Sequence, residues 1–341
     1  MKKELLLIFT TILSVFSVVA QDAQVSAYQA GAYQAGVMNV RDLAPVPGGG
    51  LIFIDYNFWN TSHAYHDQFG NEVEKFEITK DGSSTIIDLS PQISGYTNVP
   101  VLFYASSFKL FGATYMASIN PSILSSNYRM NIHASLSDST VFSSGNAGGF
   151  GDLAIMPLGL GWSFNDKIDF SVFYTFYAPT GRYHTGAADN VGRGYWVHQF
   201  QLPTYFYFKD KATALFVMPT YEINSKVKDS DVRAGSRFSI EYGISQYVTE
   251  WLELEILNGH NLQVSDDKGT DVWWDNTPLE FRDQASTVSF GAGAWPIKDM
   301  LNLRVKYAMD YGVKQRYRSN FLSFSLIFIP GILTGAKKTE G

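Results

Sequence analysis

Apolar and polar residues alternate along most of the chain, in runs of about ten residues separated by polar or Gly-rich stretches. The pattern is clearest between residues 151 and 208. Alternating runs at 151–163 and 168–177 are joined by the short Asn165-Asp166-Lys167 turn, and a Gly-rich loop leads into a third run at 195–208. Period-two alternation with a tight turn at one end and a wide loop at the other predicts an antiparallel meander.

The rest of the chain repeats this rhythm, with short turns alternating with longer loops, as in bacterial outer-membrane barrels. We expect residues 60–98 and 124–150 to be wide polar loops, the first with room for short strands of its own. We therefore predict an all-β fold, a transmembrane antiparallel up-and-down β-barrel of about 12 strands, with about 14 as the alternative. The expected strands lie at 51–59, 99–107, 113–123, 151–163, 168–177, 195–208, 212–226, 236–246, 251–263, 283–295, 301–311 and 318–329.

The same alternation separates a lipid face from a lumen face. Leu254 and Ile256, for example, alternate with Glu253 and Glu255. Because a charge facing lipid costs roughly 2–4 kcal/mol at mid-membrane, we expect the charged side chains to point into the barrel. The polar lumen candidates are Glu241, Glu253, Glu255, Arg304 and Lys306.

These five charged residues have two interpretations. They could form a polar conduit or a substrate gate. They could equally form an interior ion-pair network that fills a small barrel. The alternation is the same in both cases, so the sequence leaves both interpretations open.

The amino terminus has the pattern of a secretory signal peptide. Lys2 and Lys3 precede an apolar run from residue 5 to residue 19, and small residues precede Gln21. The run is short for a spanning helix, so we expect residues 1–20 to be removed by cleavage after Ala20. We expect residues 21–49 to form a periplasmic lead-in or plug segment, residues 50–329 the barrel, and residues 330–341 a polar carboxyl-terminal tail.

The amino-acid composition excludes several classes of protein and of binding site. The chain has no cysteine, which excludes a lipidated amino-terminal Cys, a disulfide framework and a thiolate metal site. Its net charge of −6 leaves no basic footprint for nucleic acid. Aromatic residues make up 15% of the chain, as a barrel needs at its two lipid interfaces. We predict residence in a Gram-negative outer membrane, with membrane lipid, lipopolysaccharide and the barrel-insertion machinery as partners.

Motifs for enzyme chemistry are absent from the sequence. It contains no GxSxG elbow, no His-Glu-x-x-His, no Walker motif and no dinucleotide fingerprint. His63 with His66, and Asp266 with Asp267 and Asp271, are loop residues whose spacing is not that of an EF-hand. We therefore predict no catalytic residue, no metal and no cofactor. Spacing leaves open a His–Ser pair across strands, as in barrel lipases.

Short motifs at turns and strand ends go beyond this pattern. Together they resemble the outer-membrane transporter family linked to the meta-pathway of phenol degradation, itself similar to the long-chain fatty-acid transporter barrels. The lead-in from Gly36 to Asn60 is also similar, so the resemblance covers most of the mature chain. It implies a monomeric-type outer-membrane barrel that admits hydrophobic or aromatic small molecules, and it brings no binding residues to transfer. The central motifs are Gly151-Asp152-Leu153, Ala178-Pro179-Thr180-Gly181-Arg182-Tyr183, Asn190-Val191-Gly192 and Tyr195-Trp196.

The carboxyl end departs from the usual barrel pattern. Outer-membrane barrels usually finish on an aromatic residue of the last strand, which the insertion machinery reads. Here Phe328 and Ile329 are followed by Pro330, Gly331 and a polar tail. The sequence therefore does not fix where the last strand ends.

Aromatic residues near the predicted loops also have two interpretations, an entrance for apolar ligands or the outer interfacial girdle; they are Tyr183, Tyr195, Trp196, Trp273 and Trp274. Pro179 and Gly181 are explained by geometry, since proline stops ladder pairing and glycine supplies an open dihedral. We predict a porin-like transporter or channel for uptake of hydrophobic or aromatic small molecules. The alternatives are a closed structural or adhesive barrel acting through its extracellular loops, and a barrel hydrolase.

Overall fold

The computed structural model describes residues 31–45, 49–80, 83–88, 92–134, 139–184, 187, 189–269 and 282–330, and its regular elements are β-strands. No helix within these ranges is long and apolar enough to span a membrane. The strands are β1 (Gly50–His66), β2 (Glu72–Val73), β3 (Lys75–Lys80), β4 (Ser83–Asp88), β5 (Gln92–Leu110), β6 (Ala113–Asn120), β7 (Ile123–Ala134), β8 (Ser139–Phe150), β9 (Leu153–Phe164), β10 (Ile168–Ala178), β11 (Val197–Gln201), β12 (Thr204–Phe208), β13 (Thr213–Asn224), β14 (Arg237–Tyr247), β15 (Leu252–Gln263), β16 (Gln284–Ile297), β17 (Leu301–Lys314) and β18 (Arg316–Phe328).

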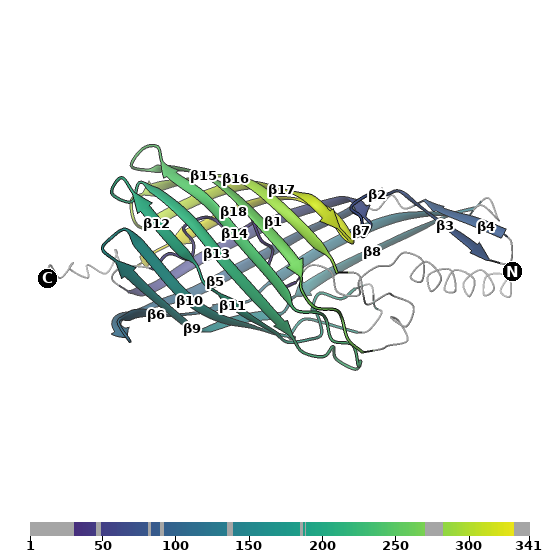
Figure 1. Cartoon of the computed structure of the whole chain (residues 1–341), viewed down its shortest axis with the longest axis horizontal. Helices are drawn as coiled ribbons and strands as arrows, with labels where there is room; N and C mark the ends of the chain where they lie inside the picture. The colour runs from purple at the N-terminus through teal and green to yellow at the C-terminus, as the bar shows by residue number, and fades with distance from the viewer. Residues whose placement is uncertain are drawn as a thin grey trace.

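The main sheet closes into a barrel because β1 pairs with β18 on one side and with β5 on the other (Figure 1). β11 and β12 share one position, since both lie between β10 and β13. The ring then contains twelve strand positions, all antiparallel: β1, β5, β6, β9, β10, β11 with β12, β13, β14, β15, β16, β17 and β18. The predicted all-β, up-and-down barrel of about twelve strands is confirmed.

The segment 124–150 differs from the predicted wide loop, whereas the segment 60–98 contains short strands of its own, as expected. β7 and β8 form a long hairpin that pairs from Ile123 with Phe150 to Ala134 with Ser139, and β7 pairs with the first residues of β5. β3 and β4 form a second hairpin. Figure 1 shows both hairpins extending beyond the barrel, at the end away from the carboxyl terminus. The Ser- and Asn-rich sequence of 124–150 predicted a loop, but a backbone ladder needs no apolar face to form.

Most short turns lie at one end of the barrel and the longer loops at the other, where β17 and β18 are nevertheless joined by Gln315 alone. At the short-turn end, Asn165 and Asp166 have φ angles of 50° and 53°, which is the type I′ geometry that suits a two-residue hairpin. β18 ends at Phe328, opposite Phe53 of β1, so an aromatic residue closes the last strand. The predicted tail from residue 331 lies outside the described residues. The boundary is set by pairing with β1, a partner that local sequence does not reveal.

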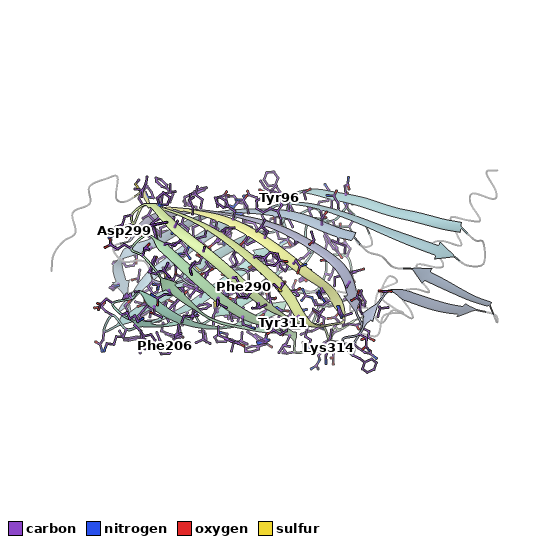
Figure 2. All side chains as sticks on the ribbon, turned by 90° about the horizontal axis from the view of Figure 1, so that it is seen from above. Tyr96, Phe206, Phe290, Asp299, Tyr311 and Lys314 are labelled. Atoms are coloured by element: carbon purple, nitrogen blue, oxygen red, sulfur yellow. The ribbon has the colours of Figure 1, made fainter. Side chains whose placement is uncertain are left out.

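Side chains alternate between an apolar outer face and a polar inner face. Leu254 and Ile256 are 46% and 50% exposed, whereas Glu253 and Glu255, which alternate with them, are 0% and 4% exposed. Phe206, Phe290 and Tyr311 lie on the outer face and are labelled in Figure 2. An exposed face of Phe, Leu, Ile, Val and Tyr is what lipid requires of a barrel wall.

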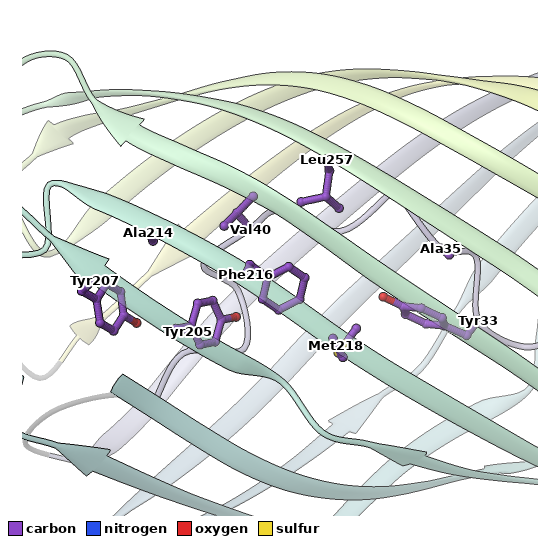
Figure 3. Packing of buried hydrophobic residues seen from close by; sticks show 9 residues of the cluster. All are labelled: Tyr33, Ala35, Val40, Tyr205, Tyr207, Ala214, Phe216, Met218 and Leu257. Carbon is purple, nitrogen blue, oxygen red and sulfur yellow. The ribbon is translucent and has the colours of Figure 1, made fainter. Parts of the chain in front are cut away.

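Residues 31–45, here named the lumen segment, run through the interior of the barrel. Tyr33, Ala35 and Val40 pack against wall residues such as Tyr205, Phe216 and Leu257 (Figure 3). On the opposite wall, Met38 and Leu43 of the segment contact a second cluster, which includes Ile54, Phe103, Met116 and Phe173. A Cβ on Gly259 of β15 would lie 2.7 Å from the Ala35 carbonyl carbon. Glycine at that position lets the two backbones approach each other.

Candidate functional site

Carboxylates on three adjacent strands accept hydrogen bonds from the backbone of the lumen segment. Tyr33 N donates to Glu222 Oε1 at 2.8 Å. Gly36 N donates to Glu241, which also accepts from the Tyr33 hydroxyl. Val40 N donates to Glu255 Oε2 at 2.8 Å. The carboxylates of the wall therefore accept hydrogen bonds from buried N–H groups of the lumen segment, which need acceptors.

The five predicted lumen candidates all lie inside the barrel. Arg304 is 2.6 Å from Glu253 and 3.6 Å from Glu255, while Lys306 is 2.8 Å from Glu255. Lys306 also donates to the Met38 carbonyl oxygen. The structure thus brings four of the five into one ion-pair network and attaches the fifth, Glu241, to the lumen segment. Buried ion pairs compensate their desolvation only when geometry and further hydrogen bonds satisfy them. Asn302 and the Met38 carbonyl oxygen accept such bonds here, while Arg304 Nη1 has no hydrogen-bond partner among the described residues.

Arg41 completes this network at the short-turn end. Its Nε lies 2.8 Å from Glu253, and its Nη2 donates to the carbonyl oxygens of Lys211 and Ala212 at 3.0 and 3.2 Å. The guanidinium also lies over the Tyr247 ring, 4.8 Å from its centroid. Sequence reasoning noted Arg41 only as part of a family-like lead-in. Its role was missed because its partners lie 170 and 212 residues away in the chain.

A second charged group lies near the long-loop end. Arg237 of β14 pairs with Asp283, and Arg316 of β18 lies 3.5 Å from the same carboxylate. These residues and Glu222 were also missed as site residues. Period-two alternation could have found the three strand residues, because each shares a face with inward polar neighbours.

A pocket of about 270 Å³ lies at the long-loop end and is here named the loop pocket. Three of the five predicted entrance aromatics contribute to it, and two lysines close one side. Trp273 and Trp274 lie outside the described residues. The lining residues are Pro179, Gly181, Tyr183, Gly194, Tyr195, Trp196, Lys226 and Lys228.

The loop pocket stands on a framework centred on Asp152. Its carboxylate accepts hydrogen bonds from Gly181 N at 3.1 Å and Arg193 N at 2.9 Å, and the Arg193 guanidinium lies 3.8 Å away. Asp152 is buried, so it fixes the two halves of the 179–196 loop to the start of β9. A carboxylate that accepts two backbone N–H groups is a strong anchor.

Residues 78–326 match the family described as "Putative MetA-pathway of phenol degradation". The match covers well over half of the chain. The chain belongs to this family. The resemblance inferred from the motifs is therefore confirmed, and those motifs now have a structural meaning. Asp152, Gly181 and Gly192 of the phenol-degradation family motifs meet at one point, where a Cβ on Gly181 would lie 2.6 Å from the Cα of Gly192.

The chain was also compared with solved structures. The chain is similar to an outer-membrane channel from Pseudomonas putida F1 at 16% identity and a TM-score of 0.63, over 85% of this chain and 99% of that chain. It is also similar to a FadL homologue from Pseudomonas aeruginosa at 10% identity and a TM-score of 0.44, over 90% of this chain and 97% of that chain. The first similarity shows a shared outer-membrane barrel fold. No curated protein matches the chain.

Gly194 shapes the aromatic wall of the loop pocket. Its φ angle is 73°, and a Cβ there would lie 2.3 Å from Tyr183 Cδ1. Glycine therefore allows both the left-handed backbone and the close approach of the Tyr183 ring. Trp196 is 45% exposed and contacts Phe176 of the outer face in a tilted arrangement, with ring centroids 5.9 Å apart. Its position suits a pocket wall and an interfacial girdle alike.

The back of the loop pocket contacts the lumen segment. Tyr195 belongs to a buried cluster with Val197, Val227 and Ala234, and both Tyr183 and Ala32 pack against that cluster. The Arg193 guanidinium donates to the Gly31 carbonyl oxygen at 3.2 Å. The pocket and the first residues of the segment are thus parts of one packed unit.

The structure describes some of the histidines and aspartates that the sequence analysis considered as metal ligands. Within the described ranges, no group of three or more His, Cys, Asp or Glu side chains could hold a metal ion. Asp266 pairs with Arg282 at 2.7 Å, and Asp267 accepts from Gly235 N at 2.7 Å; Asp271 lies outside the described residues. His66 Nδ1 lies 3.0 Å from the Gly70 carbonyl oxygen, and the His63 side chain is among those not described.

One Ser–His contact lies on the outer face. His260 Nδ1 is 2.7 Å from Ser286 Oγ, and its Nε2 is 3.2 Å from the Tyr242 hydroxyl. A hydrolytic triad orients its histidine with a carboxylate or amide at the second nitrogen, whereas this histidine has a phenol there. We assign this contact to the aromatic girdle at the lipid interface and give it no catalytic role.

Proposed function

We propose that the protein is a transporter of the outer membrane that takes up hydrophobic or aromatic small molecules and performs no catalysis. The observation that carries the proposal is the loop pocket, an aromatic-lined pocket of about 270 Å³ at the long-loop end of a membrane barrel. Membership of the phenol-degradation family supports aromatic solutes in particular. Aromatic surface combined with placed polar groups is typical of small-molecule sites.

In this proposal the solute first binds in the loop pocket and then passes the lumen segment, which acts as a plug. The support is the contact between the pocket wall and Ala32, and the hydrogen bond from Arg193 to Gly31. Passage requires the segment to shift, which breaks some of its backbone hydrogen bonds to Glu222, Glu241 and Glu255. We propose that the whole stretch from residue 21 to residue 49 serves as the plug.

A second function has its own supporting observation. The interior of the barrel is filled by the lumen segment and its ion pairs, while the β3–β4 and β7–β8 hairpins extend past the barrel (Figure 1). A closed barrel that acts through its extracellular hairpins, as a structural or adhesive protein, would have this shape. In both cases the protein's partners are membrane lipid, lipopolysaccharide and the insertion machinery.

Single-channel recording separates the two functions. The mature protein is refolded and placed in a planar bilayer, and current is recorded with and without benzyl alcohol, a neutral aromatic solute. A transporter gives steady conductance that the solute reduces. Because a solute that leaves sideways into lipid is electrically silent, uptake of radiolabelled benzyl alcohol by cells with and without the protein is measured in parallel. Absence of both effects overturns the transport proposal and favours the closed barrel.

Signal-peptide cleavage and outer-membrane residence are tested on protein purified from cells. We propose that the signal peptide is removed after Ala20 and that the mature protein resides in the outer membrane. Mass spectrometry of protein purified from outer-membrane fractions should then give a chain beginning at Gln21. Retention of Lys2 and Lys3 in the membrane-bound protein would contradict cleavage.

A further inference from the structure

We propose that the loop pocket selects single-ring aromatic compounds that carry a carboxylate, with the ring against Tyr183 and Trp196 and the carboxylate at Lys228. This inference rests on the proposed transport function and names its substrate class. Three properties of the pocket support this substrate class: its size, its charge and its rigidity.

The size of the pocket favours one aromatic ring. Pockets for drug-sized ligands span about 300–1,000 Å³, so 270 Å³ lies just below the range for multi-ring molecules. A long acyl chain would extend far beyond the eight residues that line it. Tyr183, Tyr195 and Trp196 supply aromatic surface, which favours stacking or edge-to-face contact with a ring.

The charge of the pocket favours an anion. Its lining contains two lysines and no acidic residue. Lys226 Nζ is 2.7 Å from Asp231 Oδ1, and this contact lowers the pKa of the Asp231 carboxyl through its hydrogen bond and its charge. Among the described residues, no hydrogen bond or ion pair is formed by the Lys228 ammonium. Lys228 is therefore the cation that a ligand carboxylate meets, and a hydrogen bond between charged groups is stronger than one between neutral groups.

The aromatic and cationic sides of the pocket are tied together by the backbone. Lys228 N donates to the Gly194 carbonyl oxygen at 2.8 Å, and Ser225 N donates to the Trp196 carbonyl oxygen at 2.9 Å. Trp196 N in turn donates to Ser225 Oγ at 2.9 Å. The backbones of the loop before β11 and the loop after β13 are thus held together, which keeps Lys228 beside the aromatic wall of the pocket. A preformed arrangement of this kind lowers the entropic cost of binding a rigid ligand.

Binding is measured by isothermal titration calorimetry on the detergent-solubilised full-length mature protein, with two ligands of matched shape, benzoate and benzamide. Benzoate should bind, and Lys228→Gln should weaken its binding about fivefold, the effect of one exposed ion pair. Raising the ionic strength should weaken benzoate in the same direction. Benzamide binding should respond to neither change. Lys167→Gln, at the short-turn end of the barrel, is the matched control and should leave benzoate binding unchanged.

Three outcomes overturn the inference: equal affinity for benzoate and benzamide, an unchanged benzoate affinity in Lys228→Gln, or an equal loss in Lys167→Gln. A circular-dichroism melt of each variant confirms that it is folded. Failure of the transport function gives a different result. If benzoate binds through Lys228 but neither benzoate nor benzamide crosses the membrane, the binding site is supported and the transport function is contradicted. If both solutes cross equally, the transport function is supported and the selectivity is contradicted.

Discussion

The amide of Val40 donates a hydrogen bond to the carboxylate of Glu255, a residue 215 positions further along the chain. The same carboxylate lies 2.8 Å from Lys306 and 3.6 Å from Arg304. One side chain therefore joins the lumen segment to the ion-pair network of the wall. Disturbing it tests whether the segment and the wall act as one unit.

Replacing Lys306 by methionine should destabilise the barrel, because it leaves Glu255 buried with one ion-pair partner fewer. Removing one member of a buried pair costs about 3–5 kcal/mol. The double variant Lys306→Met/Glu255→Gln should recover part of that loss, since it leaves neither charge behind. Urea unfolding in detergent micelles, followed by the gel-mobility shift of the folded barrel, measures both. A double variant as unstable as the sum of the two single variants would show that the pair is not coupled.

Deleting residues 21–49 should raise single-channel conductance several-fold, because the lumen then loses the segment that fills it. The open lumen should also prefer cations. Among the described strands, buried acidic residues outnumber basic ones: Asp169, Glu222, Glu241, Glu253, Glu255 and Asp310 against Arg237, Arg304, Lys306 and Arg316. Reversal potentials in a salt gradient measure this preference. Unchanged conductance would count against the plug.

Substituting Arg41 by lysine should loosen the lumen segment at the short-turn end. Arg41 contacts Glu253, two backbone carbonyl oxygens and the Tyr247 ring at once, which a planar guanidinium can do and a single ammonium cannot. We expect more frequent transient openings in bilayer recordings, with a fold stability within about 1 kcal/mol of the parent. Lys298→Arg at an exposed turn is a charge-conserving control and should record like the parent protein.

Replacing Asp152 by alanine should release the 179–196 loop. The change removes the acceptor for Gly181 N and Arg193 N, so Arg182 and Arg193 should become more accessible to trypsin. Cleavage of the intact barrel should be at least several-fold faster than in the parent. Asp266→Ala, which breaks an exposed pair with Arg282, is the control for general loop effects. Equal cleavage rates in parent and Asp152→Ala would show that the loop is held by other contacts.

Much of the fold could be predicted from the sequence because alternation is a local property. Leu254, Glu255 and Ile256 reveal their faces through their neighbours alone. The β7–β8 hairpin was missed although residues 128–134 of β7 alternate between apolar and polar, because β8 is rich in Ser and Gly and shows no such alternation and β7 needs β5 as a partner. The lumen segment lies within the stretch predicted as a lead-in or plug, but its contacts were not predictable, because its hydrogen bonds are made with residues about 200 positions away.

The site residues were likewise predictable only where their signal is local in the sequence. The sequence located inward charges and loop aromatics, but it could not tell that Tyr183 and Trp196 share one pocket with Lys226 and Lys228. Those residues come from two loops separated by β11, β12 and β13. Asp152 was noted within a motif, and its part in holding Gly181 and Arg193 becomes visible only when β9 and the 179–196 loop are placed together.

The path of the lumen segment also limits how the protein can assemble. Gly31 lies beside Arg193 of a long loop, Arg41 lies beside the short turn at Lys211, and β1 then starts back from the short-turn end. Once β1 and β18 have paired, residues 31–45 can reach their positions only by threading lengthwise through a finished ring. Contacts between residues 189 to 215 positions apart are slow to form because loop closure precedes them. Enclosing the segment as the last seam closes avoids this threading, so we expect the ring and its contents to form together.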